Sequence, residues 1–425
     1  MFVALFTVAL VGVVAATSST YNTLDEILQS GVDIKTYPGA VGVVGNLDGL
    51  LYMNPVGRYG YESTDPAMNM VTLFDMASVT KVVSTTSAVA LLYQSGYLGL
   101  NDLVGDILGS EFNNGGKEAI TITNCLVHNA GFAPDPNPFW STAAFNCPAT
   151  TDPDVPEDMT CWNPMIFNSI MTQVLVTPPG QTYVYSDLSF MTLQLVVGTV
   201  VLNNNLVTSE DMSDCMNIAV KGTNSPLRAG STGITADQSH EVICAFEAFL
   251  RIEMFQRPAN TVMDTTANVP WLVNTGYRPA ESLWSYAAPT VNDTGPGSYA
   301  HKRYQGQVSD GNAYAMGGIA GHAGLFSTIS DMAKFGQYML ARSIDDSPVK
   351  AMPDLNPPGV PTMAAKASGS LLPFLNSTTV KLFGTVHNIT QSSRALGWTT
   401  NTPQVRYLLL FVLFYSGCVR HQQIY

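Results

Sequence analysis

Ser78 and Lys81, three positions apart, are the residues whose types and spacing point most directly to chemistry. Lys81 is the only charged side chain between Asp75 and Asp102, and residues 77–94 are apolar or small on every face. That pattern predicts a buried helix, on which positions i and i+3 share one face, so the hydroxyl and the amine can meet. Burial lowers the pKa of an unpaired lysine toward neutrality. The pair therefore indicates an activated serine nucleophile, with the N–H groups of the first helical turn available to an oxyanion.

A second Ser-x-x-Lys, Ser347 to Lys350, shows that the spacing is not specific without its context. This copy stands in a polar segment that contains a proline. We expect no function for it.

Composition excludes several functional classes. The chain has 425 residues, of which only 12% are charged, and its net charge is -13. No basic patch and no zinc-type spacing of Cys and His is present, so we expect no nucleic-acid partner, no metal and no cofactor. The length allows one large domain or two smaller ones.

The N-terminus predicts export. Residues 1–16 form an uncharged apolar run followed by small residues, which is typical of a cleaved secretory signal peptide. A short membrane anchor is the alternative, but the run is shorter than the roughly 20 residues of a spanning helix. The glycosylation sequons at Asn292, Asn376 and Asn388 agree with a secreted protein, and we expect no stable membrane span.

Six cysteines fit an oxidising compartment. We expect disulfides between Cys147 and Cys161 and between Cys215 and Cys244, because each pair closes a loop within one inserted segment. Cys125 lies in an apolar helical stretch and is expected to remain a buried thiol.

Turn and cap signals organise the rest of the chain. The expected elements are a hairpin of 40–45 and 50–54, the Ser78 helix ending at Gly96, a short helix after Thr121, an excursion over 133–163, a turn at 177–180, a helix to about Val201, a loop over 203–238, a helix through Phe255, a helix from Ser327 or Thr328 to about Ala341, and mostly loop over 343–390.

In order along the chain, five motifs resemble the serine β-lactamase-like superfamily, in the branch that holds class C β-lactamases, D-alanyl-D-alanine carboxypeptidases and related esterases. They are Phe74-Asp-Met-Ala-Ser-Val-Thr-Lys81, Ile122-Thr-Asn-Cys-Leu-Val-His128-Asn-Ala-Gly131, Pro179-Gly180 before Tyr185-Ser186-Asp187, Gly321-His-Ala-Gly-Leu-Phe-Ser-Thr328 leading into Asp331-Met-Ala-Lys-Phe335, and Leu396-Gly397-Trp398.

The resemblance implies an α/β fold of the α+β type. In it an antiparallel sheet is packed by helices on both sides and adjoins a mainly helical region, with the active site between them. It implies Ser78 as nucleophile, Lys81 as its partner and Tyr185 as second base. Asp187 stands where asparagine is common and is expected to contact substrate. A carboxylate there disfavours an anionic β-lactam and favours a neutral ester or an amine-bearing peptide.

Two histidines accompany these motifs. His322 is interpreted as a structural or rim residue, because the family already has two candidate bases. His128 is interpreted as capping carbonyls at a helix end.

The C-terminal part departs from the family pattern. After Trp398 the family's third motif, Lys-Thr-Gly or His-Thr-Gly, does not follow, and residues 401–425 carry an apolar run instead. We therefore expect a signal peptide over 1–16, an incomplete hydrolase domain over 17–400 and an anomalous tail over 401–425. The hairpin is then expected to have an unpaired edge, which invites aggregation.

The leading interpretation is a secreted serine hydrolase that forms an acyl-enzyme with an ester, an amide or a D-amino-acid peptide. The alternatives are a catalytically impaired homologue that acts as a binding or scaffold protein, and a small membrane-anchored protein. The partner expected in the first case is a small-molecule or peptide substrate.

Overall fold

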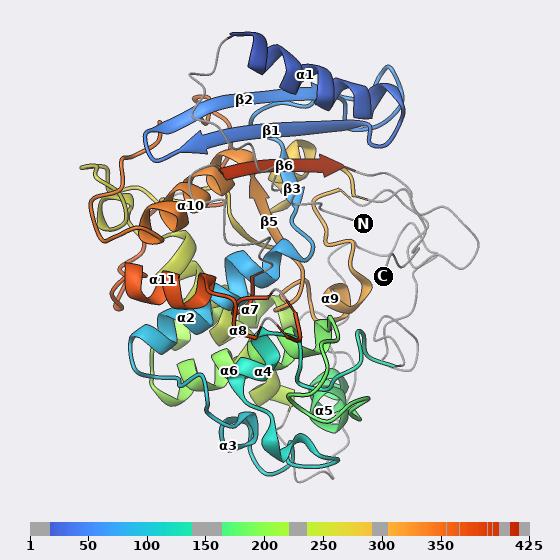
Figure 1. Cartoon of the computed structure of the whole chain (residues 1–425), viewed down its shortest axis with the longest axis vertical. Helices are drawn as coiled ribbons and strands as arrows, with labels where there is room; N and C mark the ends of the chain where they lie inside the picture. Colours follow the sequence, from blue (N-terminus) through green and yellow to red (C-terminus); the bar gives the residue numbers. More distant parts are fainter. Residues whose placement is uncertain are drawn as a thin grey trace.

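The computed structural model describes residues 18–137, 164–220, 236–290, 305–398 except 354, 365, 389 and 393, and 409–415 (Figure 1). The helices are α1 (Ser18–Asp33), α2 (Ser87–Gln94), α3 (Val104–Leu108), α4 (Ile122–Leu126), α5 (Pro164–Thr172), α6 (Asp187–Asn203), α7 (Ser209–Val220), α8 (Ala236–Leu250), α9 (Gly311–Ala315), α10 (Ile329–Arg342) and α11 (Ser377–Gly384). The strands are β1 (Gly39–Asn46), β2 (Gly49–Gly57), β3 (Leu73–Asp75), β4 (Gly276–Tyr277), β5 (Leu325–Thr328) and β6 (Leu409–Tyr415).

The upper sheet has the strand order β2-β1-β6, and both pairings are antiparallel. The predicted hairpin is confirmed as β1 and β2. Gly49 at the turn has φ of 132°, a conformation that glycine adopts without steric cost. β6 pairs with β1 along its whole length, from Gly39 opposite Tyr415 to Gly45 opposite Leu409. The prediction that this edge of the hairpin is unpaired is therefore wrong.

Helices cover both faces of this sheet (Figure 1). Ala40 and Val44 of β1 pack with Leu28 of α1, whereas Val41 and Val43 face the main core, where α10 lies against β1 and β6. Successive side chains of a strand point to opposite faces, which explains why β1 is buried on both sides. The predicted layering of an antiparallel sheet between helices is confirmed.

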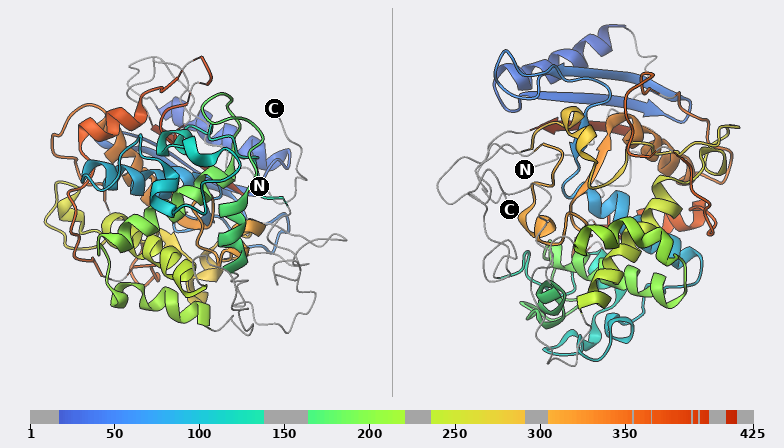
Figure 2. Two further views of the ribbon diagram at one scale, coloured as in Figure 1. Left: turned by 90° about the horizontal axis from the view of Figure 1, so that it is seen from below. Right: turned by 180° about the vertical axis from the view of Figure 1, so that it is seen from behind.

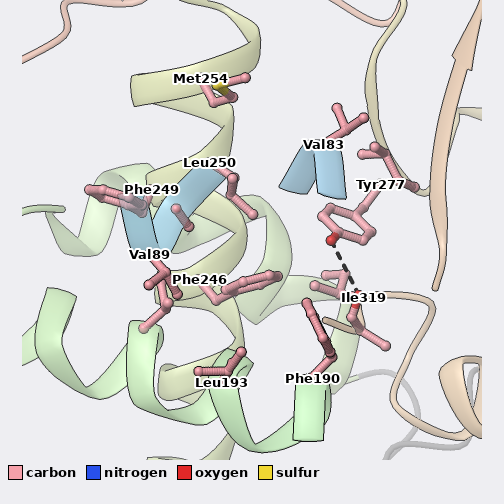
Figure 3. Packing of buried hydrophobic residues seen from close by; sticks show 14 of the residues in the cluster. Val83, Val89, Phe190, Leu193, Phe246, Phe249, Leu250, Met254, Tyr277 and Ile319 are labelled. Atoms are coloured by element: carbon pink, nitrogen blue, oxygen red, sulfur yellow. Dashed lines mark hydrogen bonds between the residues drawn. The ribbon is translucent and has the colours of Figure 1, made fainter. Parts of the chain in front are cut away.

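Below the sheet lies a mainly helical region (Figure 2). Its centre is α6, which packs on α8 so closely that a Cβ at Gly198 would lie 2.0 Å from Val242 O. Phe190 of α6 and Phe246 of α8 are buried in the core that these helices share with the Ser78 helix (Figure 3). Among the described residues, no helix is both long and apolar enough to cross a membrane.

A second small sheet, β3-β5-β4, joins the two regions. β3 ends at Asp75, three residues before Ser78, and β5 ends at Thr328, whose side chain caps α10. The sheet therefore fixes both the approach to Ser78 and the glycine-rich segment that precedes β5.

Most predicted helix boundaries are confirmed. The Ser78 helix ends before Gly96, whose φ of 78° is that of a residue just past a helix end. Thr121 and Asn124 form a capping box at the start of α4, and α6 and α10 end close to the predicted residues.

Two predicted loops contain helices. α7 lies inside 203–238 and α11 lies inside 343–390. A capping pair precedes α7, since Asp211 N–H donates to Thr208 Oγ1 and Thr208 N–H donates to Asp211. Asn376 caps α11 in the same way, by accepting from Thr379 N–H. The polar composition of both segments predicts loops, whereas their cap signals indicate helices, and the caps decide the structure.

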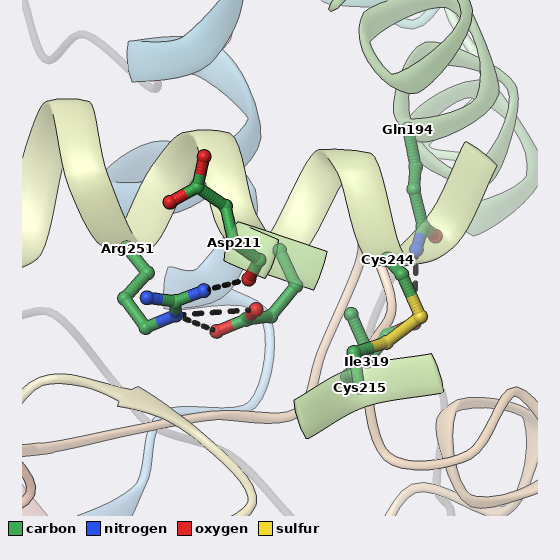
Figure 4. Close-up of a disulfide and its surroundings, with 7 residues drawn as sticks. Gln194, Asp211, Cys215, Cys244, Arg251 and Ile319 are labelled. Carbon is green, nitrogen blue, oxygen red and sulfur yellow. Dashed lines mark hydrogen bonds and ion pairs between the residues drawn. A yellow bond between two sulfur atoms is a disulfide. The ribbon is translucent and has the colours of Figure 1, made fainter. Parts of the chain in front are cut away.

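The disulfide between Cys215 of α7 and Cys244 of α8 is confirmed (Figure 4). Cys125 is a buried free thiol, as predicted, and burial raises its pKa. The second predicted pair, Cys147 and Cys161, lies outside the described residues.

We predict that Cys215→Ala with Cys244→Ala lowers the free energy of unfolding by about 3–4 kcal/mol, because the bridge spans 29 residues of chain. Denaturant unfolding measures the loss, and hydrogen exchange should show that it is largest in α7. Cys125→Ala is the matched control and should leave exchange in α7 unchanged. Equal protection of α7 with and without the bridge would contradict the prediction.

Candidate active site

Ser78 is exposed at a strained turn between β3 and its helix. The preceding residue, Ala77, has φ of 43°, which is uncommon for a residue with a Cβ. The buried Asp75 carboxylate holds the turn by accepting from Ala77 N–H at 2.9 Å and from the N–H and hydroxyl of Ser309 at 2.9 and 3.0 Å. Such strain persists only where surrounding contacts impose it, and it concentrates at functional sites.

Lys81 is 2% exposed and lies at the start of a π-helical turn, Lys81–Thr86, that leads into α2. Its Nζ donates to Ser78 Oγ at 2.9 Å and to His322 O at 3.1 Å, and it lies 2.7 Å from Asp187 Oδ1. The contacts with Ser78 and His322 are hydrogen bonds, and the contact with Asp187 is an ion pair. The predicted contact between Ser78 and Lys81 is confirmed.

The predicted charge state of Lys81 is wrong. Burial does act to lower the pKa of Lys81, but the Asp187 carboxylate and then Tyr185 outweigh it, so the net pKa is raised above the usual value. In this arrangement Lys81 is an ammonium that donates to Ser78 and does not accept its proton. Sequence reasoning missed the pairing because it treated Asp187 only as a substrate contact.

Tyr185 and Asp187 reach the site from the N-terminal end of α6. Ser186 caps this helix and donates its hydroxyl hydrogen to Ala133 O at 2.6 Å. Asp187 N–H donates to Pro134 O at 2.7 Å. Tyr185 is 36% exposed, and its ring centre lies 4.9 Å from Lys81 Nζ. The structure thus brings the four predicted site residues together around one ammonium.

His128 packs against the ring of Tyr185. Its ring stacks on that of Tyr185 with centres 4.5 Å apart, and its Nδ1 accepts from Ser186 N–H at 3.0 Å. Burial, then Arg394 and Lys81, lowers the pKa of His128 well below its usual value, so the ring is neutral. The predicted carbonyl-capping role is wrong, because Nδ1 is an acceptor here.

His322 is fully buried, so it is not a rim residue. Besides accepting from Lys81 through its backbone oxygen, it places Nε2 2.9 Å from Asp310 Oδ1. Asp310 precedes α9 and caps it by accepting from Ala313 N–H. Sequence analysis did not select Asp310, although an aspartate before a short helix is a cap signal.

Arg394 was also missed. Its guanidinium carbon lies 5.2 Å from the Tyr185 ring centre, and its Nε donates to Tyr183 OH at 3.1 Å. It directly precedes Ala395 and the Leu396–Trp398 motif, and this adjacency was the available signal.

Within the described ranges, two groups of side chains could present metal ligands. Cys215, His240 and Cys244 form one, but the two sulfurs are bonded to each other. Asp187, Asp310 and His322 form the other, with ligand atoms within 4.8 Å of one another. The Lys81 ammonium beside Asp187 disfavours a divalent cation there.

Known proteins resemble this chain in sequence and in fold. Residues 24–201 match the family model described as Beta-lactamase. A protein of Escherichia coli O157:H7, named provisionally as a D-alanyl-D-alanine carboxypeptidase, is 26% identical over 281 residues, which are 63% of this chain and 51% of that protein. A protein of Salmonella schwarzengrund with the same name is 27% identical over 283 residues, with the same shares. The chain thus spans about half the length of the curated relatives it matches.

Two solved structures share the fold. A penicillin-binding protein homologue from Pyrococcus abyssi aligns with a TM-score of 0.55 at 14% identity over 93% of this chain and 73% of that one. EstCE1, a hydrolase with promiscuous acyltransferase activity, aligns with a TM-score of 0.52 at 14% identity over 93% of each chain. The fold is therefore that of β-lactamases and transpeptidases. Residues 24–201 thus resemble the β-lactamase family, which confirms the resemblance recognised from the five motifs.

We predict that Asp187→Asn shifts the alkaline loss of Ser78 reactivity to lower pH. The substitution removes the carboxylate that raises the pKa of Lys81 and leaves the burial that lowers it, so Lys81 loses its proton, and with it the positive charge that orients Ser78, at lower pH. The measurement is the rate of fluorophosphonate labelling against pH. Asp106→Asn, at an exposed position on α3, is the control. An unchanged pH midpoint in the Asp187 variant would contradict the assignment.

We predict that His128 contributes to a loss of stability in mild acid. Because its pKa is lowered in the fold, the unfolded chain binds the extra proton, so stability falls as the pH drops below about 6.5. His128→Asn keeps an acceptor for Ser186 N–H, tolerates the backbone φ of 59°, and should flatten the dependence of melting temperature on pH. His387→Gln, at an exposed site, should leave the slope as in the wild type. Equal slopes for all three proteins would refute this role of His128.

Proposed function

We propose that the protein is a serine hydrolase that forms an acyl-enzyme on Ser78 with an ester, an amide or a D-amino-acid peptide. The single observation that carries the proposal is the contact of 2.9 Å between Ser78 Oγ and a buried lysine at the start of a helix. The match of residues 24–201 to the Beta-lactamase family model and the naming of the relatives after a carboxypeptidase support the reaction class.

Lys81 orients Ser78 and supplies positive charge, because it is held as an ammonium. Tyr185 then remains as the candidate base, since a positive neighbour favours the phenolate. In acylation Ser78 Oγ bonds to the substrate carbonyl carbon, the serine proton passes to the base and then to the leaving group, and the carbonyl–leaving-group bond breaks. In deacylation the oxygen of a water molecule bonds to the acyl carbon, the water proton passes to the base and then to Ser78 Oγ, and the bond between Ser78 Oγ and the acyl carbon breaks. Within the described chain Ser78 N–H has no acceptor, so it can serve an oxyanion.

Secretion is part of the proposal. The disulfide between Cys215 and Cys244 supports an oxidising compartment.

A second candidate is a catalytically impaired homologue that binds ligands without turnover. The observation in its favour is that the Lys81 ammonium is already paired with Asp187 and hydrogen-bonded to His322 O and Ser78 Oγ. In such a site the Lys81 ammonium has its partners before any substrate binds. Another residue would have to act as the base.

We predict that Ser78→Ala abolishes covalent labelling by a fluorophosphonate and hydrolysis of a small chromogenic ester, because no other group replaces the nucleophile. Ser347→Ala, in the exposed second Ser-x-x-Lys, is the matched control and should label like the wild type. Intact-mass analysis gives the stoichiometry. Labelling that persists without Ser78 rejects the proposed nucleophile, and a wild type that neither labels nor hydrolyses supports the binding alternative.

A further inference from the structure

Two cations lie beside the ring of Tyr185. Lys81 Nζ is 4.9 Å from the centre of this ring, and the guanidinium carbon of Arg394 is 5.2 Å from it. Both distances are within the reach of a cation–π contact. The site therefore has two sources of positive charge for a base at Tyr185.

The charge of Lys81 is partly compensated. Asp187 Oδ1 lies 2.7 Å from Lys81 Nζ, and the two side chains are only 17% and 3% exposed. An ammonium and a carboxylate at this distance have opposite fields, so each offsets much of the field of the other at a third group. Lys81 is therefore a weak source of the positive potential that a phenolate at Tyr185 requires.

Arg394 has no such partner. Among the residues that the structure describes, no carboxylate forms an ion pair with its guanidinium, which stays protonated in proteins. The ring of His128, which stacks on Tyr185, is neutral, because burial, and then the charges of Arg394 and Lys81, lower the pKa of His128 well below its usual value. Arg394 is therefore the uncompensated cation at the ring of Tyr185.

Several contacts hold Arg394 in place. Its Nε donates to Tyr183 OH at 3.1 Å, and its guanidinium carbon lies 5.7 Å from the centre of the Tyr183 ring. Its backbone O accepts from His387 N–H at 3.1 Å, and its backbone N–H donates to Ser392 Oγ at 3.2 Å. The half-buried guanidinium thus contacts two tyrosine rings in a fixed orientation.

The segment that carries Arg394 is docked on the loops of the site. Gln391 Nε2 donates to Gly180 O at 2.5 Å, and Gln391 Oε1 accepts from Asn129 Nδ2 at 2.8 Å. Gly180 belongs to the loop that leads to Tyr185. The contact with Gly180 joins parts of the chain that are 211 positions apart, and it fixes Arg394 relative to that loop.

We propose that Arg394 is a positioning residue for Tyr185, whose ring it holds and whose phenolate it stabilises by its positive charge. This inference rests on the proposed function, in which Tyr185 is the base for Ser78. As the base, Tyr185 carries a negative charge until it takes the proton of Ser78, and that charge lies beside a guanidinium that no carboxylate neutralises. Arg394 acts through Tyr185 and does not itself exchange a proton.

The test is a double-mutant cycle on the hydrolysis of a small neutral chromogenic ester by the full chain. Arg394→Gln should lower kcat about ten- to hundredfold with little change in KM, because only the charge of the base is affected. Arg394→Lys keeps a cation at this position and should recover part of the loss. In the Tyr185→Phe protein, Arg394→Gln should cause no further loss, because the group through which Arg394 acts is gone.

Arg342 offers a matched control, because its guanidinium carbon lies 4.9 Å from the ring centre of Tyr338, which takes no part in the proposed reaction. Arg342→Gln should leave kcat unchanged even where it lowers the melting temperature. Thermal unfolding shows whether each variant is folded. Arg394→Met, which keeps the apolar part of the side chain, replaces Arg394→Gln if that variant does not fold. The rate of fluorophosphonate labelling of Ser78 is the second measurement, for variants that hydrolyse the ester slowly.

The outcomes separate this inference from the proposed function. A wild type that does not react at Ser78 rejects both. A reactive wild type whose kcat is unchanged by Arg394→Gln overturns the inference alone, and so does a loss that is as large in the Tyr185→Phe protein as in the wild type. A rise in KM for an ester that carries a carboxylate, with kcat for the neutral ester unchanged, overturns the inference in favour of substrate binding by Arg394.

Discussion

The burial of one ammonium, that of Lys81, is the constraint on which the structure of the site depends. Removing a charge from water is costly unless the fold supplies acceptors at hydrogen-bond distance. Here they come from Ser78 at the turn just before Lys81 and from two distant parts of the chain, Asp187 at the start of α6 and the backbone of His322 before β5. The N-terminal end of α6 also favours a carboxylate through the helix dipole. Satisfying Lys81 therefore fixes how the helical region meets the small sheet.

Local backbone conformations that are unfavourable by themselves serve this arrangement. Ala77 adopts a left-handed conformation, and the helix begins with a π-helical turn at Lys81, a feature that is rare and concentrates at functional sites. Asp75 stabilises the turn through Ala77 N–H and ties it to Ser309. These contacts of Asp75 offset the free-energy cost of the strained turn.

How far the sequence predicts this protein depends on whether a signal is local or tertiary. The isolated lysine, the caps at Thr121 and Thr328 and the hairpin are local, and they are found where expected. The pairing of Lys81 with Asp187, 106 positions apart in sequence and 2.7 Å apart in space, reverses the direction of a pKa shift that burial alone predicts. No spacing rule reveals such a pair. Residues 409–415 were read as a tail because strand partners cannot be recognised from an apolar run.

Gly321 stands where the glycine-rich segment crosses the helical region. A Cβ at this position would lie 2.3 Å from Phe190 O, so backbone meets backbone with no side chain between them. Gly321 O accepts a hydrogen bond from Thr85 Oγ1, and Gly321 N–H donates one to Gln194 Oε1, so hydrogen bonds hold this contact as well. A hinge motion that separated the glycine-rich segment from the helical region would have to break these buried contacts together. The helical region and the glycine-rich segment are therefore held fixed relative to each other at Gly321.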